Sequence, residues 1–135
     1  MRVLLDTNVV LDFVLVRQSF FADADEIFTA LETQKFEAFV SPITPINVFY
    51  TTRKETDKAT ALTAVTELLI LVQITASNNT IYQNALSMNF NDYEAAVQHE
   101  CAVAENLDAI VTRNAKDFKN ASVKIYSPAE FLQIL

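Results

Sequence analysis

The chain contains no glycine among its 135 residues, where average usage of ~7% would give roughly nine. Glycine adopts positive φ angles at the lowest cost and lets a backbone approach a phosphate closely. A Walker A loop, a Rossmann GxGxxG turn and the nucleophile elbow of serine hydrolases all depend on it. The sequence therefore excludes the nucleotide-binding and hydrolase sites that are built on those loops.

The composition is that of a folded acidic domain. Hydrophobic residues make up 51% of the chain and the net charge is −7, the wrong overall sign for a protein that coats nucleic acid through phosphate contacts. A small nucleic-acid site with a basic rim is still compatible with this charge, because fields are screened within about 10 Å. With one cysteine, Cys101, and one histidine, His99, neither an internal disulfide nor a structural zinc site can form.

We expect residues 1–135 to form a single cytoplasmic domain. No N-terminal signal peptide is recognisable, and the longest apolar run, residues 68–72, is far below the ~20 residues that span a bilayer.

Short apolar segments alternate with longer segments of helical periodicity, which predicts an α/β fold whose parallel sheet is covered on both faces. The predicted strands are residues 2–6, 36–41, 72–75, 109–112 and 123–126. The predicted helices are residues 7–16, 23–33, 44–54, 57–71, 77–88, 91–106 and 127 onwards.

Several helix starts carry capping signals. Thr7 and Ser77 are expected to cap their helices, and Thr44 is expected to cap a helix that has Pro45 at its first position. Residues 91–94 and 127–130 resemble capping boxes, the second with a proline at the first helical position.

In an open parallel sheet, a ligand site lies past the carboxyl ends of the strands. The polar residues that follow strands or begin the next helix are therefore the candidates. They are Asp6, Asn8, Asn47, Thr112, Arg113, Asn114 and Asp117, with Asp92 and Glu94 at the start of a later helix. Carboxylates and amides without histidine or cysteine favour a site for Mg²⁺ or Mn²⁺.

Three segments together resemble the PIN domain family, and most closely its branch of bacterial VapC-type toxins. They are DTNVVLD at residues 6–12, SPITPIN at residues 41–47 and TRNAKDF at residues 112–118; residues 91–95 and 126–131 extend the resemblance over the whole chain. The resemblance implies a three-layer α/β/α sandwich around a central parallel five-stranded sheet. It also implies metal-dependent cleavage of single-stranded RNA, frequent homodimers and an antitoxin partner that reaches into the acidic groove with a basic side chain.

Matched residue by residue, the family's first acid falls on Asp6, its second on Asn47 and its third on Ala95, and its last polar pair falls on Asn114 and Asp117. VapC-type toxins usually have Glu and Asp at the second and third positions, so two expected carboxylates are missing. Asp92 precedes Ala95 by nearly one helical turn and is the nearest substitute. Glu94 shares a helix face with Gln98, which we expect to be exposed to solvent.

From this match we expect Asp6 and Asp117 to hold a Mg²⁺ or Mn²⁺ ion, and Asn114, Asn47 and Asp92 to complete the catalytic site. Arg113 and Lys116 are the candidate contacts to RNA phosphates. His99 is expected to be a core residue and Cys101 to be inert.

Two alternatives stay open. A PIN fold that no longer cuts would serve as an RNA-binding or protein-interaction module. The segment Asp6-Thr-Asn8 also resembles the Asp-x-Asp motif of haloacid-dehalogenase-type hydrolases.

Overall fold

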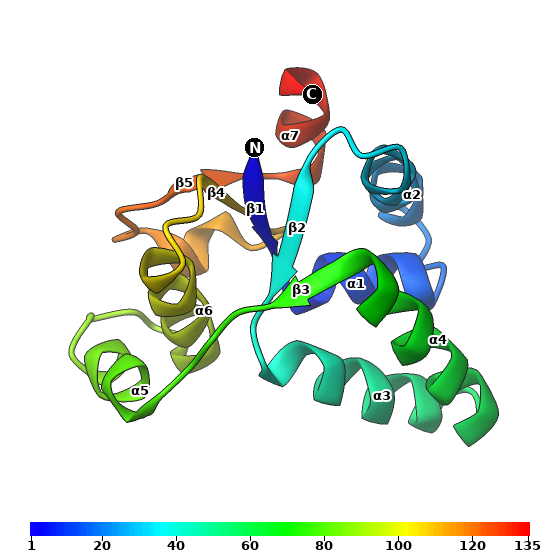
Figure 1. Cartoon of the computed structure of the whole chain (residues 1–135), viewed down its shortest axis with the longest axis horizontal. Coiled ribbons are helices and arrows are strands. Elements are labelled where there is room, and N and C mark those ends of the chain that lie inside the picture. Colours follow the sequence, from blue (N-terminus) through cyan, green and yellow to red (C-terminus); the bar gives the residue numbers. More distant parts are fainter.

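The computed structural model describes all 135 residues, with helices on both faces of a five-stranded sheet (Figure 1). Its strands are β1 (Arg2–Leu5), β2 (Glu37–Val40), β3 (Val72–Ile74), β4 (Ala109–Val111) and β5 (Lys124–Tyr126). Its helices are α1 (Thr7–Val14), α2 (Phe21–Glu32), α3 (Ile43–Glu55), α4 (Lys58–Leu71), α5 (Asn79–Leu86), α6 (Tyr93–Ala104), the 3₁₀ helix η1 (Ala115–Phe118) and α7 (Pro128–Ile134). None of the helices is both long and apolar enough to cross a membrane.

All strand pairs are parallel, and the strand order is β3-β2-β1-β4-β5. The central strand β1 therefore pairs on one side with β2 and on the other with β4, where Val3 lies opposite Ala38 and Ala109. The strand order reverses between β1 and β4, and the crevice at such a reversal is where parallel sheets bind ligands. The predicted fold class is confirmed.

Two hydrophobic cores sandwich the sheet, because alternate residues of each strand point to opposite faces. Val3 and Leu5 of β1 belong to the core beneath α1, α2, α3, α4 and α7, whereas Leu4 belongs to the core beneath α5, α6 and η1. Figure 1 shows the two groups of helices on opposite sides of the sheet. This arrangement gives the three layers that the family resemblance implies.

Four of the five predicted helix caps differ from the structure, and α2 begins at Phe21, two residues before its predicted start. Thr7 is the first residue of α1 and does not cap it, because Asp6 occupies the cap position. The helix α3 begins before Thr44, whose hydroxyl is buried against that of Thr7 at 2.8 Å.

The other two differences concern α5 and α6, which cover the second face of the sheet. Asn78, rather than Ser77, caps α5. Asp92 caps α6 through its bond from the Ala95 N–H, so the capping box predicted at residues 91–94 is wrong. The capping box of Ser127 and Glu130 is confirmed.

A chain without glycine must place other residues at positive φ, and five of them are found here: Val16, Ser19, Gln34, Asn89 and Asn106. Val16, Gln34 and Asn106 follow α1, α2 and α6, where a left-handed residue lets the next backbone N–H bond back into the last turn. After α1, this bond joins the Arg17 N–H to the Asp12 carbonyl at 3.1 Å. Val16, at φ 50°, is the most strained of these residues, because β-branched side chains fit the left-handed region poorly.

We expect the substitution Val16→Gly to raise the free energy of unfolding by about 1 kcal/mol, because release of the left-handed strain outweighs the greater chain entropy of glycine in the unfolded state. The melting temperature should rise by about 2–4 °C. Urea unfolding and thermal melting followed by circular dichroism would measure both. Val103→Gly is the matched control: this valine is also exposed but lies in α6, so its replacement should destabilise. A loss of stability in Val16→Gly would contradict the prediction.

Candidate active site

The carboxyl ends of β1 and β4 open into a polar pocket of about 290 Å³, lined by 13 residues of which 2 are hydrophobic. The N-terminal ends of α1 and α6 border it, as does α3. The lining residues are Asp6, Thr7, Asn8, Leu11, Arg17, Asn47, Thr51, Asp92, Glu94, Ala95, Gln98, Asn114 and Asp117. The expected site residues Asp6, Asn47, Asp92, Asn114 and Asp117 are thus brought together.

Asp6 lies at the floor of the pocket with 8% of its surface exposed. The Thr112 hydroxyl donates to its Oδ2 at 2.7 Å, the Asn8 amide donates to the same oxygen at 3.2 Å, and the Gln98 amide donates to Oδ1 at 3.2 Å. Burial raises the pKa of Asp6 above its usual range, although these hydrogen bonds favour the charged form. The pocket therefore holds a carboxylate whose negative charge is incompletely compensated.

Glu94 is the second carboxylate of the pocket. The residue is exposed as expected, but it also borders the pocket, and Gln98, expected on the same exposed face, is buried. Its Oε1 accepts hydrogen bonds from the Thr7 hydroxyl at 3.3 Å and from the Asn47 amide at 3.5 Å. Burial raises the pKa of Glu94, and the negative charge of Asp6 raises it further. The face that Glu94 shares with Gln98 is the face of α6 that points into the site, since Gln98 is buried against Asp6.

Three hydroxyl groups form a row of hydrogen bonds that ends at the Glu94 carboxylate. Thr7 and Thr44 are 2.8 Å apart, and Ser41 is 3.4 Å from Thr44. Because the single proton of the Thr7 hydroxyl is donated to Glu94, Thr44 must donate to Thr7. This chain joins the starts of α1 and α3 and orients a donor toward the carboxylate.

The two predicted phosphate contacts lie outside this pocket. The Arg113 guanidinium binds the buried Asp12 with two bonds, Nε to Oδ2 at 2.5 Å and a terminal nitrogen to Oδ1 at 3.1 Å, and it stacks on the Phe20 ring at 3.9 Å. Lys116 borders a neighbouring hollow of about 190 Å³, which Asp117 also lines. The structure thus gives Arg113 internal partners and leaves Lys116 at the rim.

Four polar lining residues were not among the sequence candidates: Arg17, Thr51, Gln98 and Thr7. The spacing of four residues between Glu94 and Gln98 is a signal that could have placed Gln98, because such residues share one face of a helix. No local pattern marks Arg17, whose position depends on the loop that follows α1. His99 lies in the core as expected, where it accepts a bond from the Ser122 N–H at 2.9 Å. Cys101 is fully buried, and its inertness stays a prediction.

The oxygen atoms that line the pocket are of the kind that bind one hard divalent cation. They are carboxylate, amide and hydroxyl oxygens, the ligands that Mg²⁺ and Mn²⁺ prefer, and Mg²⁺ commonly uses only one or two carboxylates and keeps several waters. Nowhere in the structure do three acidic, histidine or cysteine side chains come close enough to hold a metal between them. Asp6 and Glu94 are the two carboxylates of the pocket whose pKa is raised, that of Glu94 in part by the charge of Asp6, so their charge is the one that a cation would best compensate.

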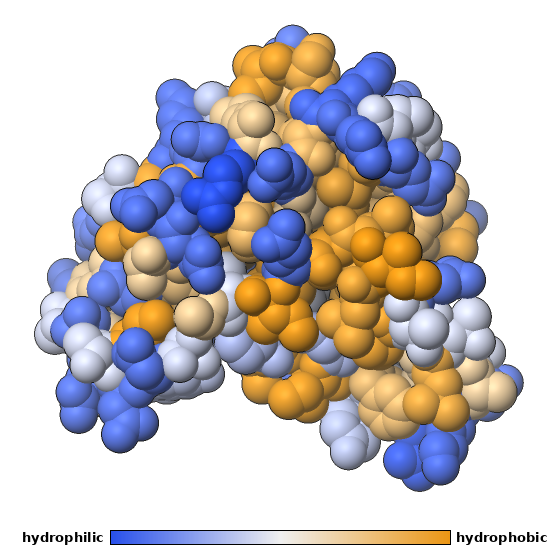
Figure 2. Space-filling model, viewed as in Figure 1, coloured by the Kyte–Doolittle hydropathy of each residue, from blue (hydrophilic) through white to orange (hydrophobic).

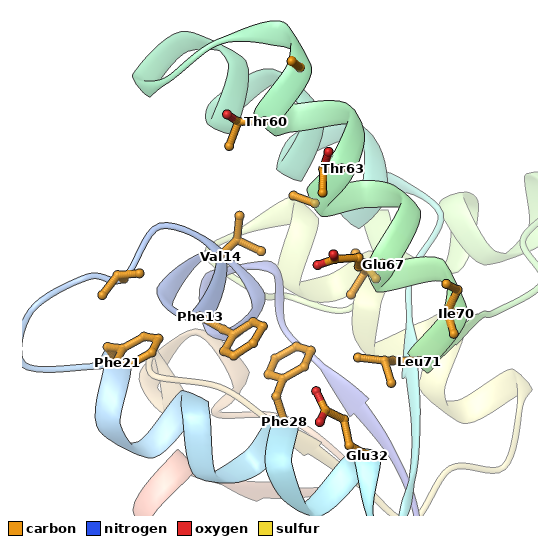
Figure 3. Close-up of a pocket in the computed structure, with 14 residues that line it drawn as sticks. Phe13, Val14, Phe21, Phe28, Glu32, Thr60, Thr63, Glu67, Ile70 and Leu71 are labelled. Atoms are coloured by element: carbon orange, nitrogen blue, oxygen red, sulfur yellow. The ribbon is translucent and has the colours of Figure 1, made fainter.

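A second hollow, of about 880 Å³, lies away from the polar pocket, between α2, α4 and the end of α1. Ten of its 14 lining residues are hydrophobic, among them Phe13, Phe21, Phe28, Leu68 and Leu71. Figure 2 shows the hydrophobic side chains gathered over this part of the surface. In the close-up, Glu32 and Glu67 point into the hollow from α2 and α4 (Figure 3). We call this hollow the apolar groove.

Comparisons with known proteins agree with this architecture. A PIN domain model matches residues 2–116. No curated protein matches the chain.

Among solved structures, the DNA-bound VapBC complex of Salmonella typhimurium has a TM-score of 0.72 at 15% identity over 95% of this chain and 98% of that one. A toxin–antitoxin complex from Klebsiella pneumoniae has a TM-score of 0.69 at 22% identity over 93% and 97%. The sarcin-ricin loop cleaving toxin VapC20 of Mycobacterium tuberculosis has a TM-score of 0.66 at 8% identity over 80% and 86%. At these identities, the likeness to the solved structures is one of fold.

We expect Asp6→Asn to raise the stability of the protein at pH 7, because the folded state no longer has to bury a charge. The pKa of Asp6 is raised in the folded state, so its destabilising effect is complete above that raised pKa and vanishes below the unfolded value. The advantage of the variant should therefore shrink as the pH falls through that window. Urea unfolding at a series of pH values would measure it.

Asp117→Asn provides the control, because Asp117 lines the same pocket but is partly exposed and makes no side-chain hydrogen bond. An advantage of Asp6→Asn that grows as the pH falls would contradict the analysis.

Proposed function

Because the chain belongs to the PIN domain family, we propose that it is an endoribonuclease that cleaves single-stranded RNA with the help of a divalent metal ion. The proposal rests above all on the convergence of Asp6 and Glu94 in one polar pocket, where burial raises the pKa of both and the charge of Asp6 further raises that of Glu94. A cation between them would relieve this unfavourable charge.

Glu94 supplies the carboxylate that Ala95 lacks. Ala95 is buried with 4% of its surface exposed, whereas the Glu94 carboxylate accepts bonds from Thr7 and Asn47 inside the pocket. The acidic site is thus shifted by one residue along α6 rather than lost. Asn47, at the family's second acidic position, serves in this proposal as a donor that orients Glu94.

Mg²⁺ or Mn²⁺ would be held by Asp6 and Glu94, with Asp117, Asn114, Asn47 and Asp92 acting through water. Such an ion activates water and stabilises the charge on a phosphate undergoing cleavage. Thr112, Asn8 and Gln98 hold the Asp6 carboxylate in one orientation. Hydrolysis adds water across the phosphodiester, leaving one RNA end with the phosphate and the other with a hydroxyl.

We expect the wild-type protein to cleave a labelled single-stranded RNA in the presence of Mn²⁺, and Asp6→Asn and Glu94→Gln each to lower the rate on the order of 100-fold or more. Glu26→Gln, at an exposed position on α2, is the matched control and should leave the rate unchanged. Mn²⁺ at ten times its Kd should also stabilise wild type by about 1.4 kcal/mol and should have a smaller effect on Asp6→Asn.

Cleavage that appears only after Ala95→Asp would contradict the proposal. The shifted carboxylate would then be insufficient, and the domain would be a binding module that descends from a nuclease.

We also propose a protein partner, on a separate observation. The Klebsiella pneumoniae structure that resembles this chain is a toxin–antitoxin complex, and the apolar groove of about 880 Å³ offers room for part of such a partner. Glu32 and Glu67 project into the groove and form no ion pair. Apolar walls with two free carboxylates fit an amphipathic helix that has a hydrophobic face flanked by basic side chains.

A synthetic amphipathic helix of about 15 residues, with a leucine face and arginine flanks, should bind the protein, and a copy with glutamate flanks should bind more weakly. The double substitution of Glu32→Lys with Glu67→Lys should reverse this preference, because it replaces attraction by repulsion. Glu26→Lys changes the charge of α2 outside the groove and should leave the preference intact. Fluorescence anisotropy of labelled peptides would measure the affinities. Equal binding of both peptides to the wild-type protein would contradict the proposed partner chemistry.

The homodimer and the cytoplasmic location expected from the sequence stay predictions.

A further inference from the structure

Arg17 is the only cationic side chain among the residues that line the polar pocket. The other ionisable groups there are carboxylates, and the remaining polar groups are amides and hydroxyls. A nucleic-acid phosphate that approaches this pocket would be repelled by the carboxylates, and Arg17 offers the one positive charge that attracts it. The arginine is therefore the one lining residue with the charge to attract an anion.

The backbone holds Arg17 on both sides. Its N–H donates to the Asp12 carbonyl at 3.1 Å, in the bond that the left-handed Val16 makes available. Its own carbonyl accepts bonds from the N–H groups of Phe20 and Phe21, at 3.2 and 2.8 Å. The position of Arg17 is thus set by the end of α1 and the start of α2.

Two carboxylates orient the Arg17 side chain, but neither accepts a hydrogen bond from its guanidinium. One terminal nitrogen lies 3.8 Å from Asp12 and the other lies 3.7 Å from Glu55, so both ion pairs are longer than the longest hydrogen bond of the pocket, 3.5 Å between Asn47 and Glu94. The side chain is 33% exposed. Arg113 differs in this respect, because its two short bonds to Asp12 occupy its guanidinium.

We infer that Arg17 binds a phosphate group of the single-stranded RNA at the edge of the polar pocket. A planar guanidinium with free N–H groups matches the oxygens of a phosphate and can bind two of them at once. Asp12 acts as a positioning residue. Its carboxylate is hydrogen-bonded to Arg113, and its longer-range attraction orients the Arg17 guanidinium without forming a hydrogen bond to it. This inference rests on the proposed function, because it assigns the contact that places the substrate.

The test measures binding without cleavage. The affinity of a fluorescent single-stranded RNA of about 10 nucleotides is determined by anisotropy without divalent metal, at several salt concentrations. Arg17→Gln should weaken binding about 10-fold and lower the slope of log K against log salt by about 1, because one phosphate contact is lost. Arg17→Lys should keep the slope and lose part of the affinity. Arg53→Gln, which removes an exposed arginine of α3 that lies outside the pocket, is the matched control.

The outcomes separate this inference from the proposed function. Wild-type RNA cleavage together with an unchanged affinity and salt slope in Arg17→Gln would overturn the role of Arg17 and leave the nuclease standing. Wild-type protein that neither binds nor cuts RNA would overturn both. A general loss of folding in Arg17→Gln would appear in its melting curve. In that case Arg17→Lys decides: an RNA affinity and a salt slope both equal to those of wild type would overturn the inference.

Discussion

A carboxylate at the end of the central strand governs the architecture of this protein. Asp6 follows the last residue of β1, and its N–H continues the sheet by bonding to the Val111 carbonyl at 3.0 Å. A charged group in such a place is costly unless donors surround it. The donors come from three separate elements, since Asn8 belongs to α1, Gln98 to α6 and Thr112 to the exit of β4. Compensating one charge therefore ties together segments that are far apart in the sequence.

The same requirement explains the character of the pocket. The starts of α1 and α6 lie at its border, and the N-terminal end of a helix carries a partial positive charge that favours nearby carboxylates. These partial charges lower the cost of collecting Asp6 and Glu94 but do not cancel it, since burial still raises the pKa of both. A site that gathers negative charge in this way favours a bound cation, which is the property that a metal-dependent enzyme needs.

Much of the fold could be predicted from the sequence, because it depends on patterns that neighbouring residues carry. The apolar runs marked all five strands, and the alternation with helices implied that they are parallel. Asp6, Asn114 and Asp117 could be assigned to one edge of the sheet for the same reason. Helix starts were less predictable at Thr7, Thr44 and Ser77, because tertiary contacts or a neighbouring residue took over the expected cap.

The rest of the site could not be predicted, because it is formed by contacts between residues that are distant in the sequence. Helical periodicity correctly grouped Glu94 with Gln98, but it could not tell which side of α6 faces the pocket. Arg113 follows a strand as a ligand-binding residue would, yet its partner Asp12 lies 101 residues earlier in the chain. The position of Arg17 in the pocket depends on the turn after α1, and the path of that turn could not be predicted from the sequence.

The two hollows of the molecule meet just after α1, where Val16 lines the apolar groove and the next residue, Arg17, lines the polar pocket. The carboxylates lie toward the other end of this helix, whose first residue, Thr7, bonds to Glu94. The eight residues of α1 span about 12 Å, a length that roughly four extended residues would cover. A polypeptide anchored in the groove could therefore place its next few residues at the carboxylates, where tethering would give it an effective concentration in the millimolar range. Such a tail would compete with RNA without having to bind the pocket tightly by itself.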